Sequence, residues 1–190
     1  MRDVPYQILT AGVYVHVSGC FPFQVGPSPS GETLGVVRLG GHREGEETGW
    51  QCAAREAFEE AHLRLRPRQP PATYWVAAAD ETAFHPGSWP VVADEVAPLV
   101  VVTRPEGTLT PMYLASSQDE PIPSTEAKGL LLLRPNHIHQ LVEDSLTLGQ
   151  YLADGGSARL RARLPHHLVL EPFLQLRLLH TLLHRHPELA

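Results

Sequence analysis

The stretch GGHREGEETGWQCAAREAFEEAHL, residues 40–63, combines a glycine turn, crowded carboxylates and a change to helical periodicity. Its glycine pair follows an apolar run and marks a turn. From Thr48 to Ala61 the apolar residues recur at helical spacing, with Trp50, Phe58 and several alanines on one stripe. We therefore expect a helix that docks onto a sheet through Trp50 and Phe58, with the alanines allowing close approach.

Three carboxylates share another side of this helix. At ~100° per residue, Glu56, Glu59 and Glu60 fall within an arc of about 100°. Such neighbours repel one another by a few tenths of a kcal/mol per pair in water, on the order of 0.2–0.5. A hard divalent cation reverses that sign, because Mg²⁺ and Mn²⁺ take oxygen ligands. A solvated acidic face is the alternative, and the three glutamates alone leave it open.

The flanking residues give these glutamates a wider context. The spacing resembles the signature of the Nudix hydrolase family, G-x5-E-x7-R-E-U-x-E-E-x-G-U, where U is a bulky apolar residue. The matching positions are Gly41, Glu47, Arg55, Glu56, Glu59, Glu60 and Leu63. His62 replaces the family's last glycine, Ala57 is smaller than usual, and Leu39 stands where many members carry proline. The family's glycine often ends the helix in a left-handed conformation, so we expect His62 either to adopt it at a cost of ~1 kcal/mol or to alter the turn slightly, without loss of the site.

The resemblance implies hydrolysis of a pyrophosphate bond in a nucleoside diphosphate linked to another moiety, with Mg²⁺ or Mn²⁺ as cofactor. It implies metal ligation by the Gly40 carbonyl and the helix glutamates, and an ion pair between Glu47 and Arg55 that braces them. A polar loop offers a candidate for a further ligand, for which we favour Glu126 over Glu120, although an exposed loop acid is an equal alternative. The general base is either Glu56 or a carboxylate outside the signature. The catalytic set is therefore Glu47, Arg55, Glu56, Glu59 and Glu60.

Candidate substrate contacts lie outside the signature helix. Arg38 precedes the glycines and His42 follows them, so either side chain could meet a phosphate, although water could equally satisfy His42. Trp89 stands in an irregular stretch and is our candidate for stacking on a base. Core packing is the better interpretation of the tyrosines and the other tryptophans.

The remaining chemistry-bearing residues indicate no second site. The pairs His137-x-His139 and His166-His167 lack a third ligand at a zinc-finger spacing, so we interpret them as scattered surface or helix-end residues. Cys52 is expected to be a packed thiol.

The pattern along the chain predicts an α/β fold, and the resemblance implies a Nudix-like α/β/α sandwich with a mixed sheet. We expect loops at residues 18–31 and 83–94, and helices at 136–152 and 172–184. The strands are expected at residues 12–17, 33–39, 72–79, 96–103, 110–116 and 129–134. Residues 1–152 would form the Nudix domain. Residues 153–190 would be a helical extension, packed on the domain or in a homodimer contact.

Composition limits the function classes. The formal net charge is -6, which argues against binding a nucleic acid polymer or a membrane surface. Two cysteines make no disulfide framework, and no apolar run is long enough to span a bilayer, so a cytoplasmic protein is expected. Besides the enzyme, two functions stay open. One is a non-catalytic Nudix-fold module that binds or senses nucleotides, and the other is a structural interaction protein with an acidic face.

Overall fold

The computed structural model describes residues 7–89 and 94–190, which form two sheets with helices on both sides. The first sheet has the strand order β5-β2-β10-β9-β7-β8, and β1 and β6 also pair with β10. Its strands are β1 (Gln7–Ile8), β2 (Thr10–His16), β5 (Leu39–His42), β6 (Arg66–Pro67), β7 (Tyr74–Ala77), β8 (Asp80–Pro86), β9 (Val100–Thr103) and β10 (Thr108–Ser116). Parallel and antiparallel pairs alternate, so the sheet is mixed, as expected.

The second sheet has five strands in the order β12-β11-β3-β4-β13. These are β3 (Phe21–Pro27), β4 (Leu34–Val37), β11 (Gly129–Leu133), β12 (Ser157–Leu160) and β13 (Leu170–Pro172). The helices are α1 (Gly49–Ala61), α2 (Pro135–Glu143), α3 (Leu148–Ala153), α4 (Leu174–Arg185) and the short 3-10 helix η1 (Pro187–Leu189).

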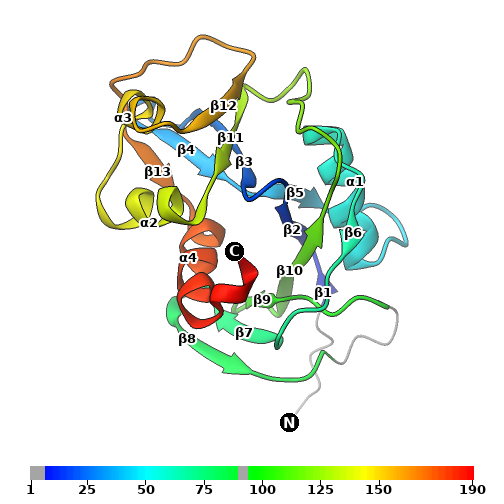
Figure 1. The fold of residues 1–190 in the computed structure, drawn as a ribbon. Coiled ribbons are helices and arrows are strands. Elements are labelled where there is room, and N and C mark those ends of the chain that lie inside the picture. The colour runs from blue at the N-terminus through cyan, green and yellow to red at the C-terminus, as the bar shows by residue number, and fades with distance from the viewer. Residues whose placement is uncertain (1–6, 90–93) are drawn as a thin grey trace.

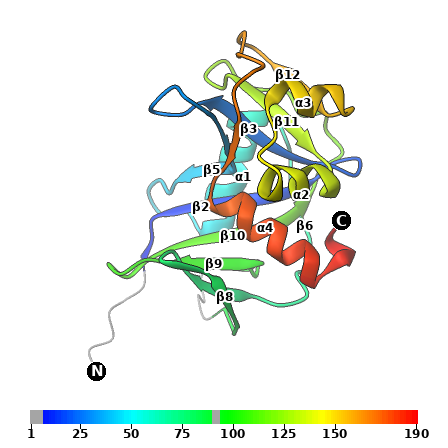
Figure 2. The same ribbon diagram turned by 90° about the vertical axis from the view of Figure 1, so that its left-hand side faces the viewer.

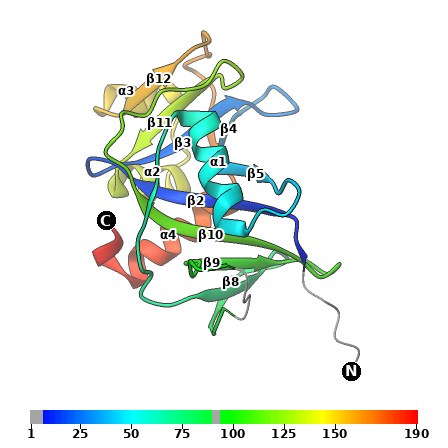
Figure 3. The same ribbon diagram turned by 90° about the vertical axis from the view of Figure 1, so that its right-hand side faces the viewer.

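The helices cover opposite faces of the structure (Figures 1–3). Helix α1 lies across β2, β5 and β10, where alanines and valines from both sides form one buried cluster. Helices α2 and α4 lie on the other side, over a larger cluster that reaches into both sheets. The layers are therefore helix, sheet and helix, which confirms the predicted sandwich.

Strand β3 occupies the segment that the sequence predicted as a loop at residues 18–31. Its glycine and prolines suggested a turn, but Phe21, Phe23 and Val25 alternate along it and are each at most 2% exposed. The strand pairs with β4 and β11 through backbone groups that Pro22 and Pro27 do not interrupt. The predicted loop at 83–94 is also partly wrong, because its start belongs to β8.

The helix predicted at residues 136–152 is two helices. Ser145 has a positive φ of 53°, which breaks the helical path between α2 and α3. Helix α2 begins at Pro135, one residue before the expected Asn136 cap, because proline suits the first helical turn. Helix α3 has its own capping box, in which Thr147 accepts from the backbone of Gln150.

The sequence suggested that residues 153–190 form a helical extension, but the segment is only partly helical. It also contains β12, which pairs with β11, and β13, which pairs with β4, at the two edges of the second sheet. Helix α4 buries Leu176, Leu178, Leu179 and Leu182 in the larger cluster. This part of the chain therefore packs on the sandwich.

The structure also bears on membrane insertion. Within residues 7–89 and 94–190, every helix is too short or too polar to cross a bilayer.

Candidate active site

Helix α1 begins and ends where the sequence predicts. Thr48 is the N-cap, and its side chain and that of Gln51 each bond the other's backbone N–H. At the other end His62 has φ 56° and ψ 30°, the left-handed conformation, and its N–H bonds the Phe58 carbonyl. Of the two outcomes expected for His62, the left-handed helix end is therefore the one present.

The end of α1 also holds the loop that follows β10. The backbone N–H groups of Ile122 and Ser124 donate to the carbonyls of Ala61 and Glu60 at 3.0 and 2.9 Å. The His62 ring places Nδ1 3.0 Å from the Ile122 carbonyl. The loop that carries Glu126 is thus fixed against the helix that carries the other glutamates.

The buried face of α1 is made of small residues. Cys52, Ala53, Ala57 and Ala61 are fully buried, and Cys52 is a packed thiol as expected. Phe58 does not dock, contrary to the sequence prediction. It is 46% exposed and lies beside His62, while the smaller residues Cys52, Ala53, Ala57 and Ala61 form the face buried against the sheet.

Two glycines allow the glutamates to lie against the strand. A Cβ on Gly41 would lie 2.3 Å from Oε1 of Glu56, so only glycine leaves room for that carboxylate. Gly40 has φ 140°, and its N–H donates to Oε2 of Glu60 at 2.8 Å. The glycine pair therefore seats both carboxylates.

Glu60 is the most enclosed carboxylate of the set. Its Oε1 accepts from Nε2 of Gln24 at 2.7 Å. Burial raises the pKa of Glu60 to about 7, and the charge of Glu56 adds to the rise against the hydrogen bonds from Gly40 and Gln24. Burial also lowers the pKa of the neighbouring Arg38, while the charge of Glu60 opposes that shift. Arg38 is thus an interior counter-charge beneath the carboxylates.

Arg55 joins the carboxylates of Glu47, Glu56 and Glu59 and a backbone carbonyl. Its Nε lies 2.7 Å from Oε1 of Glu47, which is the ion pair that the sequence predicted. Its Nη1 lies 3.0 Å from Glu56 and 2.9 Å from Glu59, and Nη2 donates to the His42 carbonyl at 2.9 Å. The hydrogen bond to Glu47 raises the pKa of Arg55 most, and the reciprocal bond lowers the pKa of Glu47. Arg55 holds the loop, the strand and the helix together.

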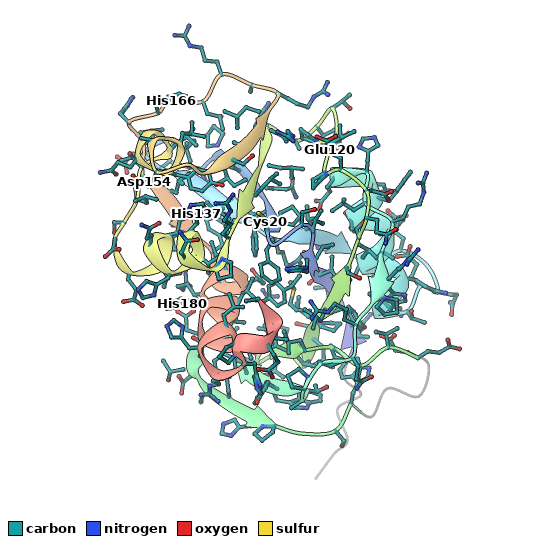
Figure 4. All side chains as sticks on the ribbon, in the orientation of Figure 1. Cys20, Glu120, His137, Asp154, His166 and His180 are labelled. Carbon is teal, nitrogen blue, oxygen red and sulfur yellow. The ribbon has the colours of Figure 1, made fainter. Side chains whose placement is uncertain are left out.

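The carboxylates converge on a cleft of about 410 Å³. Its lining residues are Gln24, Glu56, Glu59, Glu60, Ser124, Thr125, Glu126 and Ala127. Glu126 therefore faces the helix glutamates across the cleft. Glu120, the alternative that the sequence left open, is instead paired with Arg159 at 2.8 Å (Figure 4).

A second pocket of about 310 Å³ adjoins this cleft and shares Gln24, Glu126 and Ala127 with it. Lys128 and Phe173 line its other side. We missed Gln24 and Phe173 in the sequence. The inward alternation of Phe21, Phe23 and Val25 would have indicated a strand and placed Gln24 on its opposite face.

The predicted substrate contacts are not brought together. His42 is exposed, and its backbone rather than its ring takes part in the contacts of Arg55. Trp89 packs 5.9 Å from Trp75, against the cluster of Ile8, Val101 and Leu109, and lines neither pocket. A contact between Trp89 and substrate has no support in this geometry.

Asp94 supports the start of α1, and the sequence gave no sign of it. Its carboxylate accepts from the Tyr113 hydroxyl and from the backbone of Gly49 and Trp50. These N–H groups are the unsatisfied donors of a helix N-terminus, which a carboxylate stabilises. Asp94 thereby fixes the helix on β10.

The donor set suits a hard divalent cation. Four carboxylates reach one cleft, and oxygen ligands of this kind are those that Mg²⁺ and Mn²⁺ prefer. Glu56 lies against a bare glycine and Glu60 is enclosed, so their like charges repel at a cost in free energy. A bound cation would offset that cost.

Comparisons with known proteins bear on the fold. No family model and no curated protein matches the sequence. A Nudix-family hydrolase from Clostridium perfringens overlays with a TM-score of 0.50 at 16% identity, over 70% of this chain and 84% of that one. A NUDIX hydrolase from Nitrosomonas europaea gives 0.44 at 17% identity over 70% and 61% of the two chains. A C. elegans Ap4A hydrolase gives 0.42 at 17% identity over 67% and 81%.

Proposed function

We propose that this chain, which has the fold of the Nudix hydrolases, is a Mg²⁺- or Mn²⁺-dependent pyrophosphohydrolase of that family. The observation that carries the proposal is the cleft of four carboxylates, three of them on one helix face and one on the opposite loop. The substrate class is a nucleoside diphosphate linked to another moiety.

Glu56, Glu59, Glu60 and Glu126 would hold the cation, with the Gly40 carbonyl as a further ligand. A divalent ion in such a site neutralises the diphosphate and lowers the pKa of attacking water. Arg55 positions Glu56 and Glu59 and is itself held by Glu47, so the ligands keep their geometry as charge develops.

A base must also accept the proton of the attacking water. Glu56 and Glu126 are the two candidates, since they approach the cleft from opposite walls. Replacing each residue by glutamine distinguishes the two candidates. The variant that lacks the general base should lose the increase in hydrolysis rate with pH, and the other variant should keep it.

The adjoining pocket would take the group attached to the diphosphate. Lys128, the only lysine of the chain, and the Phe173 ring stand on its wall. An ammonium suits a phosphate or sugar hydroxyl, and an aromatic face suits a planar base. The pocket is therefore placed to discriminate between substrates that share the same diphosphate.

The test is turnover of a panel of nucleoside triphosphates, dinucleoside polyphosphates, ADP-ribose, nucleotide sugars and coenzyme A derivatives, with Mg²⁺ and with a chelator. We expect metal-dependent product for one class, and a loss of at least about 100-fold in Glu59→Gln. Glu46→Gln is the matched control, because Glu46 is an exposed glutamate outside the cleft.

The alternative is a Nudix-fold module that binds nucleotides without cleaving them. Calorimetric binding of a panel member with no product at any metal concentration would establish it. Absence of both binding and turnover would instead leave only an acidic interaction surface.

A further inference from the structure

Three histidines meet on the side of the molecule away from the acidic cleft. His139 belongs to α2, and His180 and His184 belong to α4. One ring nitrogen from each lies within 4.8 Å of the others. Figure 4 labels His180 on α4, whereas the loop with Glu120 and helix α1 lie on the opposite side.

The core holds these histidines in place. His180 and His184 are four residues apart and share one face of α4. Ile138 and Leu141 of α2 and Leu179 and Leu183 of α4 are buried in the same cluster, so the two helices are packed against each other. The rings project from a fixed helix pair.

The ring nitrogens have the arrangement of metal ligands. Nδ1 of His139 and Nε2 of His180 share a hydrogen bond at 3.1 Å, and a metal ion bound by both nitrogens would take the place of its proton. Two ligands about 2.0–2.1 Å from a tetrahedral ion are separated by roughly 3.3 Å, so this spacing fits a shared cation.

The tautomer of His184 follows from its partner. Its Nδ1 lies 2.9 Å from the backbone carbonyl of His180, and because a carbonyl only accepts, Nδ1 carries the proton. Nε2 of the neutral ring then keeps its lone pair for a metal. Metal-binding histidines characteristically donate their other N–H in this way.

The remaining coordination positions are left to solvent. Oε1 of Glu143, on α2, lies 3.8 Å from Nε2 of His180 but is not among the ligand atoms that all lie within 4.8 Å of one another. The three rings also line an open pocket of about 400 Å³, so an ion has access and a water molecule can complete its coordination.

We propose that His139, His180 and His184 bind a transition-metal ion, for which Zn²⁺ is the expected occupant, with a water molecule completing its coordination. Imidazole nitrogens suit zinc, whereas the oxygen donors of the acidic cleft suit Mg²⁺ and Mn²⁺. The ion would join α2 to α4 and so stabilise the packing of α4 on the sandwich. This proposal is independent of the proposed hydrolysis.

The test uses tag-free protein titrated with Zn²⁺ by calorimetry, with excess Mg²⁺ present to occupy the acidic cleft. We expect one zinc per chain, a higher melting temperature with zinc, and binding at least about tenfold weaker in His139→Gln and His184→Gln. His166→Gln is the matched control, since His166 lies on a loop apart from the cluster (Figure 4).

Further readouts separate the outcomes. Co²⁺ in place of zinc should give the intense visible absorption of a tetrahedral site, which His184→Gln should lose while its circular dichroism and hydrolytic activity stay unchanged. Glu59→Gln should bind zinc like the parent protein. Equal zinc binding by the parent and both histidine variants, or loss of zinc in Glu59→Gln alone, would overturn the proposal.

Discussion

The acidic cleft and the histidine cluster differ in how their residues are assembled. The glutamates of the cleft come mainly from a single helix, at spacings of three and four residues, and Arg55 links them to the preceding loop. The histidines come from two helices about 40 residues apart, and the packing of apolar residues between these helices brings them together. The comparison teaches that a site built from local spacing is visible in a sequence, whereas a site built by tertiary packing is not.

The largest effect is expected at the glycine beneath Glu56. In Gly41→Ala the new Cβ would meet the Glu56 carboxylate, so the ligand must move. A displacement of about 1 Å costs on the order of 100-fold in rate, and we expect at least that loss in metal-dependent turnover. Zinc binding at the histidine cluster should not change.

Gly45→Ala is the control for that variant, because its φ of 50° adds backbone strain to the same loop while its Cβ meets no atom within 4 Å, which separates strain from displacement of Glu56. Steady-state kinetics at saturating metal would make the measurement. If Gly41→Ala had the same kinetics as the parent protein, the position of the Glu56 carboxylate against Gly41 would not matter for turnover.

An intermediate effect is expected from the arginine brace. Arg55→Gln removes the group that positions Glu56 and Glu59, which should weaken cation binding. It also removes a positive charge near the site, which should strengthen cation binding. We therefore expect kcat to fall by about 10–100-fold, with a smaller change in the Mg²⁺ concentration needed for activity. Glu47→Gln should resemble it, because Glu47 acts on the ligands through Arg55.

Arg159→Gln provides the comparison, since it breaks an exposed ion pair with Glu120 outside the cleft. Exposed pairs contribute about 0–1 kcal/mol, so this variant should keep its rate. Similar kinetics for Arg55→Gln and Arg159→Gln would contradict the bracing role.

The smallest effect is expected for Phe58, which the sequence predicted to be buried and which is exposed in the structure. Phe58→Ala should change the free energy of unfolding by about 0.5 kcal/mol or less, because the side chain is half exposed. Ala57→Leu, one residue earlier, should destabilise by about 1–3 kcal/mol, since the site is fully buried against the sheet. Urea unfolding of both variants measures the difference, and a larger loss for Phe58→Ala would restore the predicted docking face.

Much of the candidate site was predicted from the resemblance to the Nudix signature, which is compact along the chain for a physical reason. Carboxylates, glycines and their ion-pair partner act within one turn-helix unit, so their spacing along the chain nearly determines their spacing in space. The pair of Glu47 with Arg55 that the resemblance implied is present, and His62 takes the left-handed helix end, one of the two outcomes expected for it.

The errors arose where packing outweighs local preference. Helical periodicity alone placed Phe58 among the buried residues of α1. In the structure, the face of α1 that packs against β2 and β5 is made of alanine and cysteine instead. Prolines and a glycine concealed β3, whose inward residues are held by its neighbours in the sheet. Asp94 caps α1 from a distant segment, which no local pattern announces.

The edges of the second sheet have a consequence for how the protein is made. Strand β4 pairs with β13, whose residues are added to the growing chain about 135 positions later. At translation rates of about 5–20 residues per second, that interval is on the order of ten seconds. Throughout it the nascent chain presents unpaired strand backbone and apolar side chains, so we expect the protein to depend on chaperones at the ribosome more than its final compactness would suggest.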